Sequence, residues 1–174
     1  EVVSTAGDTW LGGDDFDLAL ASAAANAFWR ETKIEIRNQV VRWQRLLIAA
    51  EKAKRELSFK EETILGLPDA ALTPEGSLSL RFPVTRGQFN EFSAELVERS
   101  LETCRETLEI QGISPEEVDT VYLSGGTSAI PSIKEALSNM FGRSPRMAIP
   151  PERAVVIGGA LHAANLYQKR FPNG

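Results

Sequence analysis

The chain has 174 residues, of which 43% are hydrophobic and 25% charged, and its formal net charge is −5 at pH 7. This composition is ordinary for a soluble globular protein, and the length suffices for one core or for two subdomains that share a hinge. The negative charge argues against a nucleic-acid partner, because phosphate binding needs a basic surface, and the cations are interleaved with acids, as in Glu51-Lys52 and Lys54-Arg55-Glu56.

Single cysteine and histidine residues limit the chemistry further. Cys104 cannot form an internal disulfide and suits a reducing compartment, so we expect a cytoplasmic protein. His162 alone excludes a multi-histidine metal site, and we expect no metal ligands. No signal peptide and no membrane-spanning run of ~18–20 apolar residues is visible, so no membrane contact is expected. Because residues 1–5 already resemble a strand, we expect the chain to be a fragment of a longer protein.

Acidic residues open the first predicted helix. A Gly-Gly pair at 12–13 precedes Asp14, Asp15 and Asp17, which begin an Ala-rich helix running to about residue 32. Carboxylates in a first turn complement the helix dipole, which is the plain interpretation of this cluster. Three carboxylates beside two glycines could also hold a cation or a ribose.

A second helix is predicted over residues 40–57. Its apolar residues at helical spacing should face the core: Leu46, Ala50, Ala53 and Leu57. Four polar residues at i, i+3, i+4 and i+7 form one stripe: Glu51, Lys54, Arg55 and Ser58. The plain interpretation of this stripe is a solvated face with Glu-to-Arg support four residues apart.

The middle of the chain predicts a hairpin and a long helix. Residues 63–67 and 77–84 have strand patterns, and the Pro- and Gly-containing segment 68–76 is expected to be a long connection between them. A capping box at 85–88 should open a helix that continues to about residue 109. Residues 114–117 form a second capping box, with proline at the first helical position.

A strand, a Gly-Gly turn and a helix follow one another in residues 121–131. The strand should be short and buried, and Gly125 and Gly126 would let a ligand approach the backbone closely, because no Cβ stands in the way. Pro131 suits the first position of a helix, whose N-terminus offers unpaired N–H groups to an anion such as phosphate. Any tight strand-to-helix turn would have the same features, so this motif alone leaves both interpretations open.

The last part of the chain predicts a helix at 131–141, a short strand near 146–149 and a helix over 151–168. Gly158 and Gly159 in the last helix suggest close packing against another backbone. The whole pattern is mixed α/β. We expect residues 1–11 and 94–174 to form one subdomain, and residues 12–93 to form a helix-rich α+β subdomain inserted into it.

Together these motifs resemble the second lobe of the ATPase domain of the heat-shock protein 70 family, which has the actin-like ATPase (ribonuclease H-like) fold. Four segments match in order and spacing across essentially the whole chain: 6–17, 51–58, 123–131 and 151–155. The resemblance implies that the stripe on the second helix meets the adenine and ribose of ATP or ADP. Arg55 would stack on the purine, Lys54 and Ser58 would donate hydrogen bonds, and Glu51 would accept from ribose hydroxyls, with Asp14 near the ribose.

The resemblance places a second group of residues at the same nucleotide. Gly125 and Gly126 would lie against its phosphate-ribose side, and Thr127 and Ile130 of the same motif would also belong to the site. Glu152 stands where the family usually has aspartate, and it keeps the acceptor. One departure is serious, because Ala129 replaces an arginine that usually covers the other adenine face; its loss would cost on the order of 1 kcal/mol.

The resemblance implies half of the motor of an ATP-driven, stress-response chaperone that folds proteins. The family's catalytic lysine and metal-holding aspartates belong to the other lobe, so we expect no catalytic residues here, Mg held mainly by that lobe, and no ATP hydrolysis by this chain alone. The implied partners are unfolded polypeptide, a nucleotide-exchange factor docking on the inserted subdomain, and a J-domain co-chaperone. Because of Ala129, a nucleotide-independent regulatory or binding module stays open as an alternative; a filament-forming actin-like protein is disfavoured by the 51–58 motif.

Overall fold

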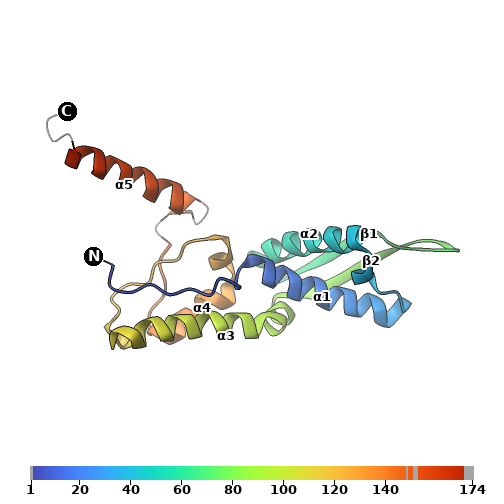
Figure 1. The fold of residues 1–174 in the computed structure, drawn as a ribbon. Helices are drawn as coiled ribbons and strands as arrows, with labels where there is room; N and C mark the ends of the chain where they lie inside the picture. Colours follow the sequence, from blue (N-terminus) through green and yellow to red (C-terminus); the bar gives the residue numbers. More distant parts are fainter. Residues whose placement is uncertain (1, 148, 151–152, 171–174) are drawn as a thin grey trace. The chain divides into compact units, whose positions relative to one another are not determined.

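The computed structural model describes residues 2–147, 149–150 and 153–170 of the chain, which divides into two compact units, residues 1–113 and residues 114–174 (Figure 1). Helices and one two-stranded sheet make up the regular structure of the described residues, so the predicted mixture of helix and strand is confirmed. No helix in these residues is both long and apolar enough to cross a membrane. The predicted insertion of 12–93 between 1–11 and 94–174 stays a prediction.

The first helix, α1 (Gly13–Thr32), has the predicted bounds. The Gly12 N–H donates to Asp15 Oδ2 at 2.7 Å, so one member of the acidic cluster caps the helix as predicted. The helix ends where Lys33 takes the left-handed conformation, with φ of 61°. Capping at both ends therefore defines this element from nearby residues alone.

The second helix, α2 (Val40–Leu57), also has the predicted bounds and follows a short 3-10 turn, η1 (Ile36–Asn38). The four apolar residues expected to face the core are all buried. This face of α2 packs against α1 and against strand β1 (Glu62–Thr73) (Figure 1). Because the apolar residues recur every three or four positions, the opposite side of the helix is left to the polar stripe.

The hairpin consists of β1 and β2 (Gly76–Thr85), which pair antiparallel. The strands are confirmed, but the long connection predicted over 68–76 is wrong: pairing continues as far as Thr73 opposite Gly76. A register shift between Leu67 and Ala71 accommodates Pro68, which has no N–H to give to the ladder. The proline therefore marks an irregularity within the strand and not its end.

Donors from α2 satisfy the carbonyls that this irregularity leaves outside the ladder. Arg45 donates to the Pro68 carbonyl and Arg42 donates to the Asp69 carbonyl, both at 3.1 Å. Asp69 itself has a positive φ of 54°, a conformation that aspartate tolerates better than most residues. The hairpin and α2 are thus joined by hydrogen bonds as well as by their apolar faces.

The third helix, α3 (Arg86–Gln111), begins at the predicted capping box. The Gln88 N–H donates to Thr85 Oγ1 at 3.2 Å, and the Thr85 N–H donates to Gln88 Oε1 at 3.0 Å. The Arg86 guanidinium donates to the carbonyls of Leu57 and Lys60, at 2.8 and 2.9 Å. One side chain at the start of α3 therefore also fixes the chain that leaves α2.

The N-terminal segment differs from its prediction. No strand forms in residues 2–8, and Val2 and Val3 are exposed, because the described residues supply no strand for this segment to pair with. An ion pair holds its end instead: Asp8 Oδ2 lies 2.6 Å from a guanidinium nitrogen of Arg99 on α3.

The second unit contains helices α4 (Pro131–Phe141) and α5 (Ala154–Arg170) and two 3-10 turns, η2 (Pro115–Glu117) and η3 (Gly126–Ala129). The helix predicted at 131–141 is confirmed, with Pro131 at its first position. The capping box at 114–117 forms, but it opens only a short 3-10 turn.

Two predictions for this unit are wrong. The strands expected near 121–123 and 146–149 reduce, among the described residues, to one parallel bridge between Tyr122 and Arg146, and Tyr122 is exposed. A strand that lacks a longer partner cannot bury its side chains. In the part of the chain that the structure describes, no atom lies within 4 Å of the position a Cβ would occupy at Gly158 or Gly159, so they do not pack against another described backbone. The predicted start of this helix, at 151–152, lies outside the described residues.

Candidate nucleoside site

Four polar residues of α2 form the predicted stripe, and two of them bind each other. A guanidinium nitrogen of Arg55 lies 2.6 Å from Glu51 Oε1, four residues earlier on the helix. The Arg55 side chain is 75% exposed, so its planar group can be reached by a ligand. Ser58 ends the helix, and its hydroxyl lies 3.4 Å from the Lys54 carbonyl, which is a long hydrogen bond.

Lys54 has a different environment from the rest of the stripe. Its ammonium donates to the Gly13 carbonyl and to Asp17 Oδ2, both at 2.9 Å, and its side chain is only 11% exposed. Gly13 and Asp17 both belong to the first turns of α1. Lys54 thus connects α2 to the beginning of α1 and does not project into solvent.

The Asp17 carboxylate shares this burial. Burial raises the pKa of Asp17 above its ordinary value, and the hydrogen bond and charge of Lys54 oppose that rise. Removing a charge from water disfavours the ionised carboxylate, and the neighbouring ammonium offsets part of that penalty. From the sequence alone, Asp17 is one of three acids whose plain interpretation is capping of α1. Its contact with Lys54 arises only when α1 and α2 pack together.

A cavity of about 360 Å³ lies between the beginning of α1 and the middle of α2. It brings Asp14 and Glu51 to one space, although they are 37 positions apart in the sequence. Its walls are partly acidic and partly apolar: Asp14, Asp15, Asp17, Leu18, Gln44, Leu47, Ile48 and Glu51. Carboxylates accept hydrogen bonds from hydroxyl groups, and apolar walls suit the faces of a sugar or base.

The acids of this cavity do not make a metal centre. Among the described residues, no group of three or more His, Cys, Asp or Glu side chains is arranged to hold an ion.

The predicted turn of the second unit has an open backbone. Gly125 has a φ of 87°, which glycine adopts without strain, and η3 begins at Gly126. No atom of the described residues lies within 4 Å of the Cβ position of either glycine, so a ligand can approach the main chain. Thr127 is half-buried in the same turn, whereas the Ile130 side chain is buried and could offer a ligand its backbone alone.

The predicted site residues thus fall into two groups. The first unit contains Asp14 and the α2 stripe. Within this group, Asp14 and Glu51 line the same cavity. The second unit contains Gly125, Gly126, Thr127 and Ile130. Glu152 lies outside the described residues.

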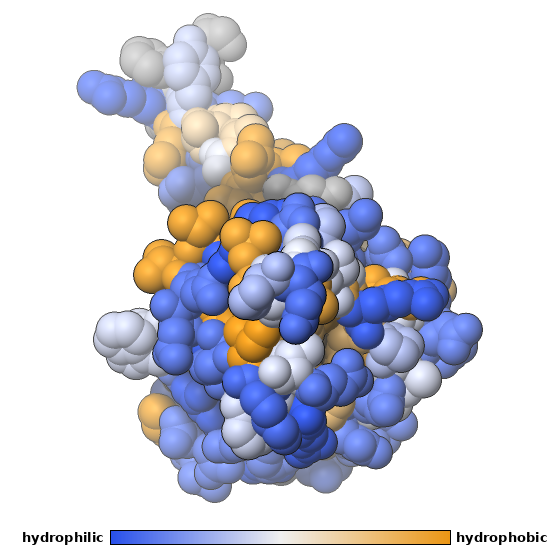
Figure 2. Space-filling view, turned by 90° about the vertical axis from the view of Figure 1, so that its right-hand side faces the viewer, coloured by the Kyte–Doolittle hydropathy of each residue, from blue (hydrophilic) through white to orange (hydrophobic). Residues whose placement is uncertain are grey.

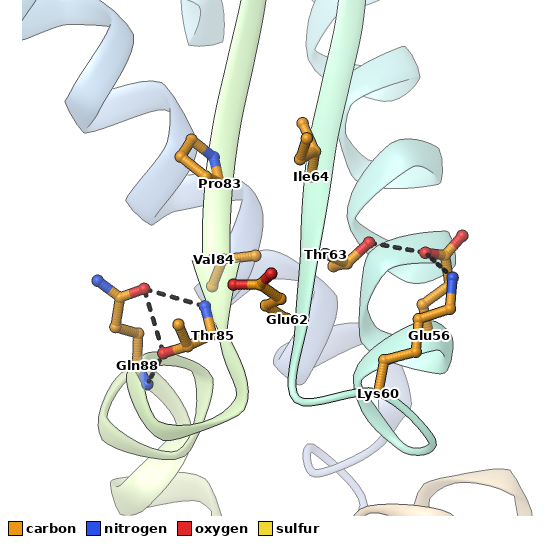
Figure 3. Close-up of a pocket in the computed structure, with 9 residues that line it drawn as sticks. All are labelled: Glu56, Lys60, Glu62, Thr63, Ile64, Pro83, Val84, Thr85 and Gln88. Carbon is orange, nitrogen blue, oxygen red and sulfur yellow. Dashed lines mark hydrogen bonds and ion pairs between the residues drawn. The ribbon is translucent and has the colours of Figure 1, made fainter.

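A second cavity, of about 660 Å³, was not predicted from the sequence (Figure 3). It lies at the base of the hairpin and contains none of the predicted site residues. Glu56 at its edge accepts hydrogen bonds from Thr63 at 2.7 Å and from Lys60 at 3.2 Å, and these bonds lower the pKa of Glu56 (Figure 3). The spacing of Glu56 and Lys60 was readable as a helical pair, but the Thr63 contact comes only from the packing of α2 on β1.

Exposed apolar side chains gather at the other end of the hairpin. Val40, Val41 and Leu72 line a shallow groove of about 570 Å³ where α2 begins beside β1. Figure 2 faces the end of the first unit that carries the hairpin turn, and it shows apolar side chains grouped among hydrophilic ones. Apolar groups surrounded by polar ones are typical of a surface that binds another protein.

Comparison with known families identifies the chain. A family model described as Hsp70 protein matches residues 1–170. The chain therefore belongs to the Hsp70 family. At the level of the family this supports a chaperone nucleotide-binding domain of the actin-like ATPase fold, which binds ATP or ADP with Mg and acts with polypeptide substrates and co-chaperones.

Proposed function

We propose that this chain is the adenosine-binding half of the nucleotide-binding domain of an ATP-dependent, cytoplasmic protein-folding chaperone. The observation that carries the proposal is the cavity between α1 and α2, where Asp14 and Glu51 meet. Two further observations support it: the exposed Arg55, which pairs with Glu51 of the cavity, and the open backbone of Gly125 and Gly126.

In this proposal each residue has a role in binding. Glu51 and Asp14 accept hydrogen bonds from the ribose hydroxyls, and Arg55 covers one face of the adenine. Gly125 and Gly126 let the phosphate-ribose side approach the main chain. Bound Mg would neutralise phosphate charge; the acids that the structure describes form no group arranged to hold a metal, and we assign the Mg ligands to another part of the protein.

The remaining parts of the proposal concern the whole protein. Hydrolysis would need residues outside this chain, and it would change the angle between two lobes. This motion would control the grip of the protein on unfolded polypeptide. A J-domain co-chaperone would act on the same cycle. We assign the docking of a nucleotide-exchange factor to the groove at Val40, Val41 and Leu72, because these apolar side chains are exposed.

A titration followed by NMR tests the nucleoside site. The 174-residue chain is titrated with adenosine and then with ADP, and the amides of residues 51–58, Gly125 and Gly126 are followed. We expect saturable shifts in these segments. Glu51→Gln should weaken binding about three- to tenfold, because hydrogen bonds to charged acceptors are the stronger ones. Glu91→Gln, an exposed acid on α3, is the matched control.

A folded sample that shows no shifts at millimolar ligand would contradict the adenosine site. That result would favour the alternative, a regulatory module that has kept the fold without nucleotide binding, for which Ala129 is the supporting feature in the sequence. ATPase activity of the whole protein then separates the two, because only the first function requires turnover.

A further inference from the structure

The cavity at the base of the hairpin contains an acid, Glu62, that is available to a cation from outside (Figure 3). No ion pair in the described part of the chain includes Glu62. The nearby cations are bound elsewhere: Lys60 lies 3.2 Å from Glu56, and Arg86 lies 2.5 Å from Glu61. The Glu62 carboxylate is exposed and, within the described residues, has no counter-ion.

Strand pairing places Glu62 on the outer face of the hairpin, beside apolar side chains. Glu62 lies opposite Thr85, and two positions further along β1 Ile64 lies opposite Pro83. Successive side chains of a strand point to opposite faces, so Glu62 and Ile64 share one face, and the buried Leu65 belongs to the other. Ile64 is 48% exposed, so an apolar wall stands next to the carboxylate.

The second acid of the cavity is already satisfied. Glu56 Oε2 accepts hydrogen bonds from Thr63 and from Lys60 (Figure 3). Lys60 therefore offsets the charge of Glu56, and the residues that line the cavity carry one negative charge in excess. Figure 3 shows the Glu62 carboxylate between the two strands, on the side of Thr85, away from the Glu56 group.

A long side chain with a cationic end is complementary to both features. Arginine and lysine lay their alkyl stems along apolar surface and keep the charged group in polar surroundings. A guanidinium can donate two parallel hydrogen bonds to one carboxylate, which an ammonium cannot do. The cavity, of about 660 Å³, is larger than one such side chain, so the neighbouring residues of a polypeptide can enter with it.

We propose that this cavity is a docking site for a partner polypeptide. An arginine of the partner packs its alkyl stem on Ile64 and Pro83 and pairs its guanidinium with Glu62. The cavity shares no lining residue with the one assigned to adenosine, nor with the apolar groove at the other end of the hairpin. This surface therefore binds its partner independently of the nucleoside.

A titration with capped tripeptides tests the docking site. Acetyl-Ala-Arg-Ala-amide, and the same peptide with citrulline in place of arginine, are added to the 174-residue chain while NMR follows the amides of residues 62–64 and 85. Citrulline has the shape of arginine without its charge. We expect saturable shifts and about two- to fivefold tighter binding of the arginine peptide, the range typical of one exposed ion pair. The difference should shrink as salt is raised.

Three variants of the chain separate charge from apolar contact. Glu62→Gln should lower the affinity for the arginine peptide to that for the citrulline peptide, which should itself be unaltered. Ile64→Ala should weaken both peptides alike, about two- to threefold, because it removes contact with the stem and no charge. Glu106→Gln makes the same change in net charge at an exposed position far along α3, and it should leave both affinities unaltered.

Four results would overturn the proposal. A folded chain without saturable shifts at residues 62–64 and 85 would exclude the site. Equal binding of the two peptides, or an equal loss of both in Glu62→Gln, would show that Glu62 recognises no cation. Acetyl-arginine-amide that binds as tightly as the tripeptide would show that the cavity takes a single side chain and no polypeptide.

Discussion

Two basic residues next to each other on α2 have opposite environments. Lys54 faces α1 and is buried against Asp17, while Arg55 points away and is 75% exposed. Successive helical residues are about 100° apart, so a step of one residue separates a structural cation from a ligand-accessible one. At the scale of single residues, the role of a basic side chain therefore depends on its burial and cannot be deduced from its residue type alone.

Substitution of the two residues should have contrasting effects. Lys54→Ala leaves the Asp17 carboxylate buried without a partner, and it should lower the free energy of unfolding by about 3–5 kcal/mol. Arg55→Ala removes an exposed pair, and it should change that free energy by less than about 1 kcal/mol while weakening adenosine binding. Urea unfolding measures both, and equal losses of stability in the two variants would contradict the assignment.

Asp8 makes part of the stability dependent on pH. The Trp10 N–H, at 2.9 Å, and the Arg99 guanidinium lower the pKa of Asp8. An acid with a lowered pKa in the folded state stabilises above its ordinary pKa, and this contribution is lost as the pH falls through the lowered value. Asp8→Asn should therefore be less stable than the unmodified chain at pH 6, and the difference should shrink below about pH 4.

Unfolding by urea at several pH values checks this expectation. Glu62→Gln, which removes a carboxylate at an exposed position on β1, is the control. A difference between Asp8→Asn and the unmodified chain that stays constant from pH 6 to acid pH would contradict the role of the ion pair.

At the scale of elements, capping decides where helices begin. Thr85 and Gln88 satisfy each other's N–H groups at the start of α3. The same pattern at 114–117 closes only a 3-10 turn, because no apolar face follows it to be buried: none of the residues of η2 is buried. A cap therefore marks a helix start, and packing decides whether the helix continues.

Removal of the cap at α3 should be measurable. Thr85→Ala should lower the free energy of unfolding by about 1 kcal/mol, because the Gln88 N–H loses its acceptor. Glu95→Ala, at an exposed position inside the same helix, should change it by less than about 0.5 kcal/mol. Urea unfolding of the two variants is the measurement, and equal effects would show that the cap contributes nothing specific.

At the scale of the whole molecule, the two units differ in core. The buried apolar residues of the described chain lie mainly in the first unit, whereas the second contributes Ile130, Leu137 and Phe141. The α5 side chains that the structure describes are largely exposed. Local opening requires less free energy where few apolar contacts must be broken.

Hydrogen exchange should report this difference. We expect slow exchange for the amides of α1, α2 and the hairpin, and fast exchange for those of α5. Leu46→Ala, which removes a buried side chain of α2, should destabilise by about 2–5 kcal/mol and speed exchange in the first unit. Protection of α5 equal to that of α2 would contradict the expected order.

Much of the first unit could be predicted from local sequence. The bounds of α1 and α2 and the start of α3 follow from glycine, acidic and capping-box residues within a few positions of each helix end. The inward face of α2 follows from apolar residues every three or four positions. Strands depend more on distant segments. The bulge at Pro68 is supported by β2 opposite it and by donors from α2, and the residues next to the proline, taken alone, predicted a loop.

The polar stripe on α2, the glycine turn and, through four ordered motifs, the Hsp70 family could all be predicted from the sequence alone. These are properties of spacing along one chain. The packed structure was needed to show that Lys54 is paired with Asp17 and that Asp14 and Glu51 share a cavity. It was also needed to show that, among the described residues, the strand expected near Tyr122 reduces to one bridge. These three features depend on contacts between segments that are distant in the sequence. Burial and charge pairing between such segments are established only when the elements pack together.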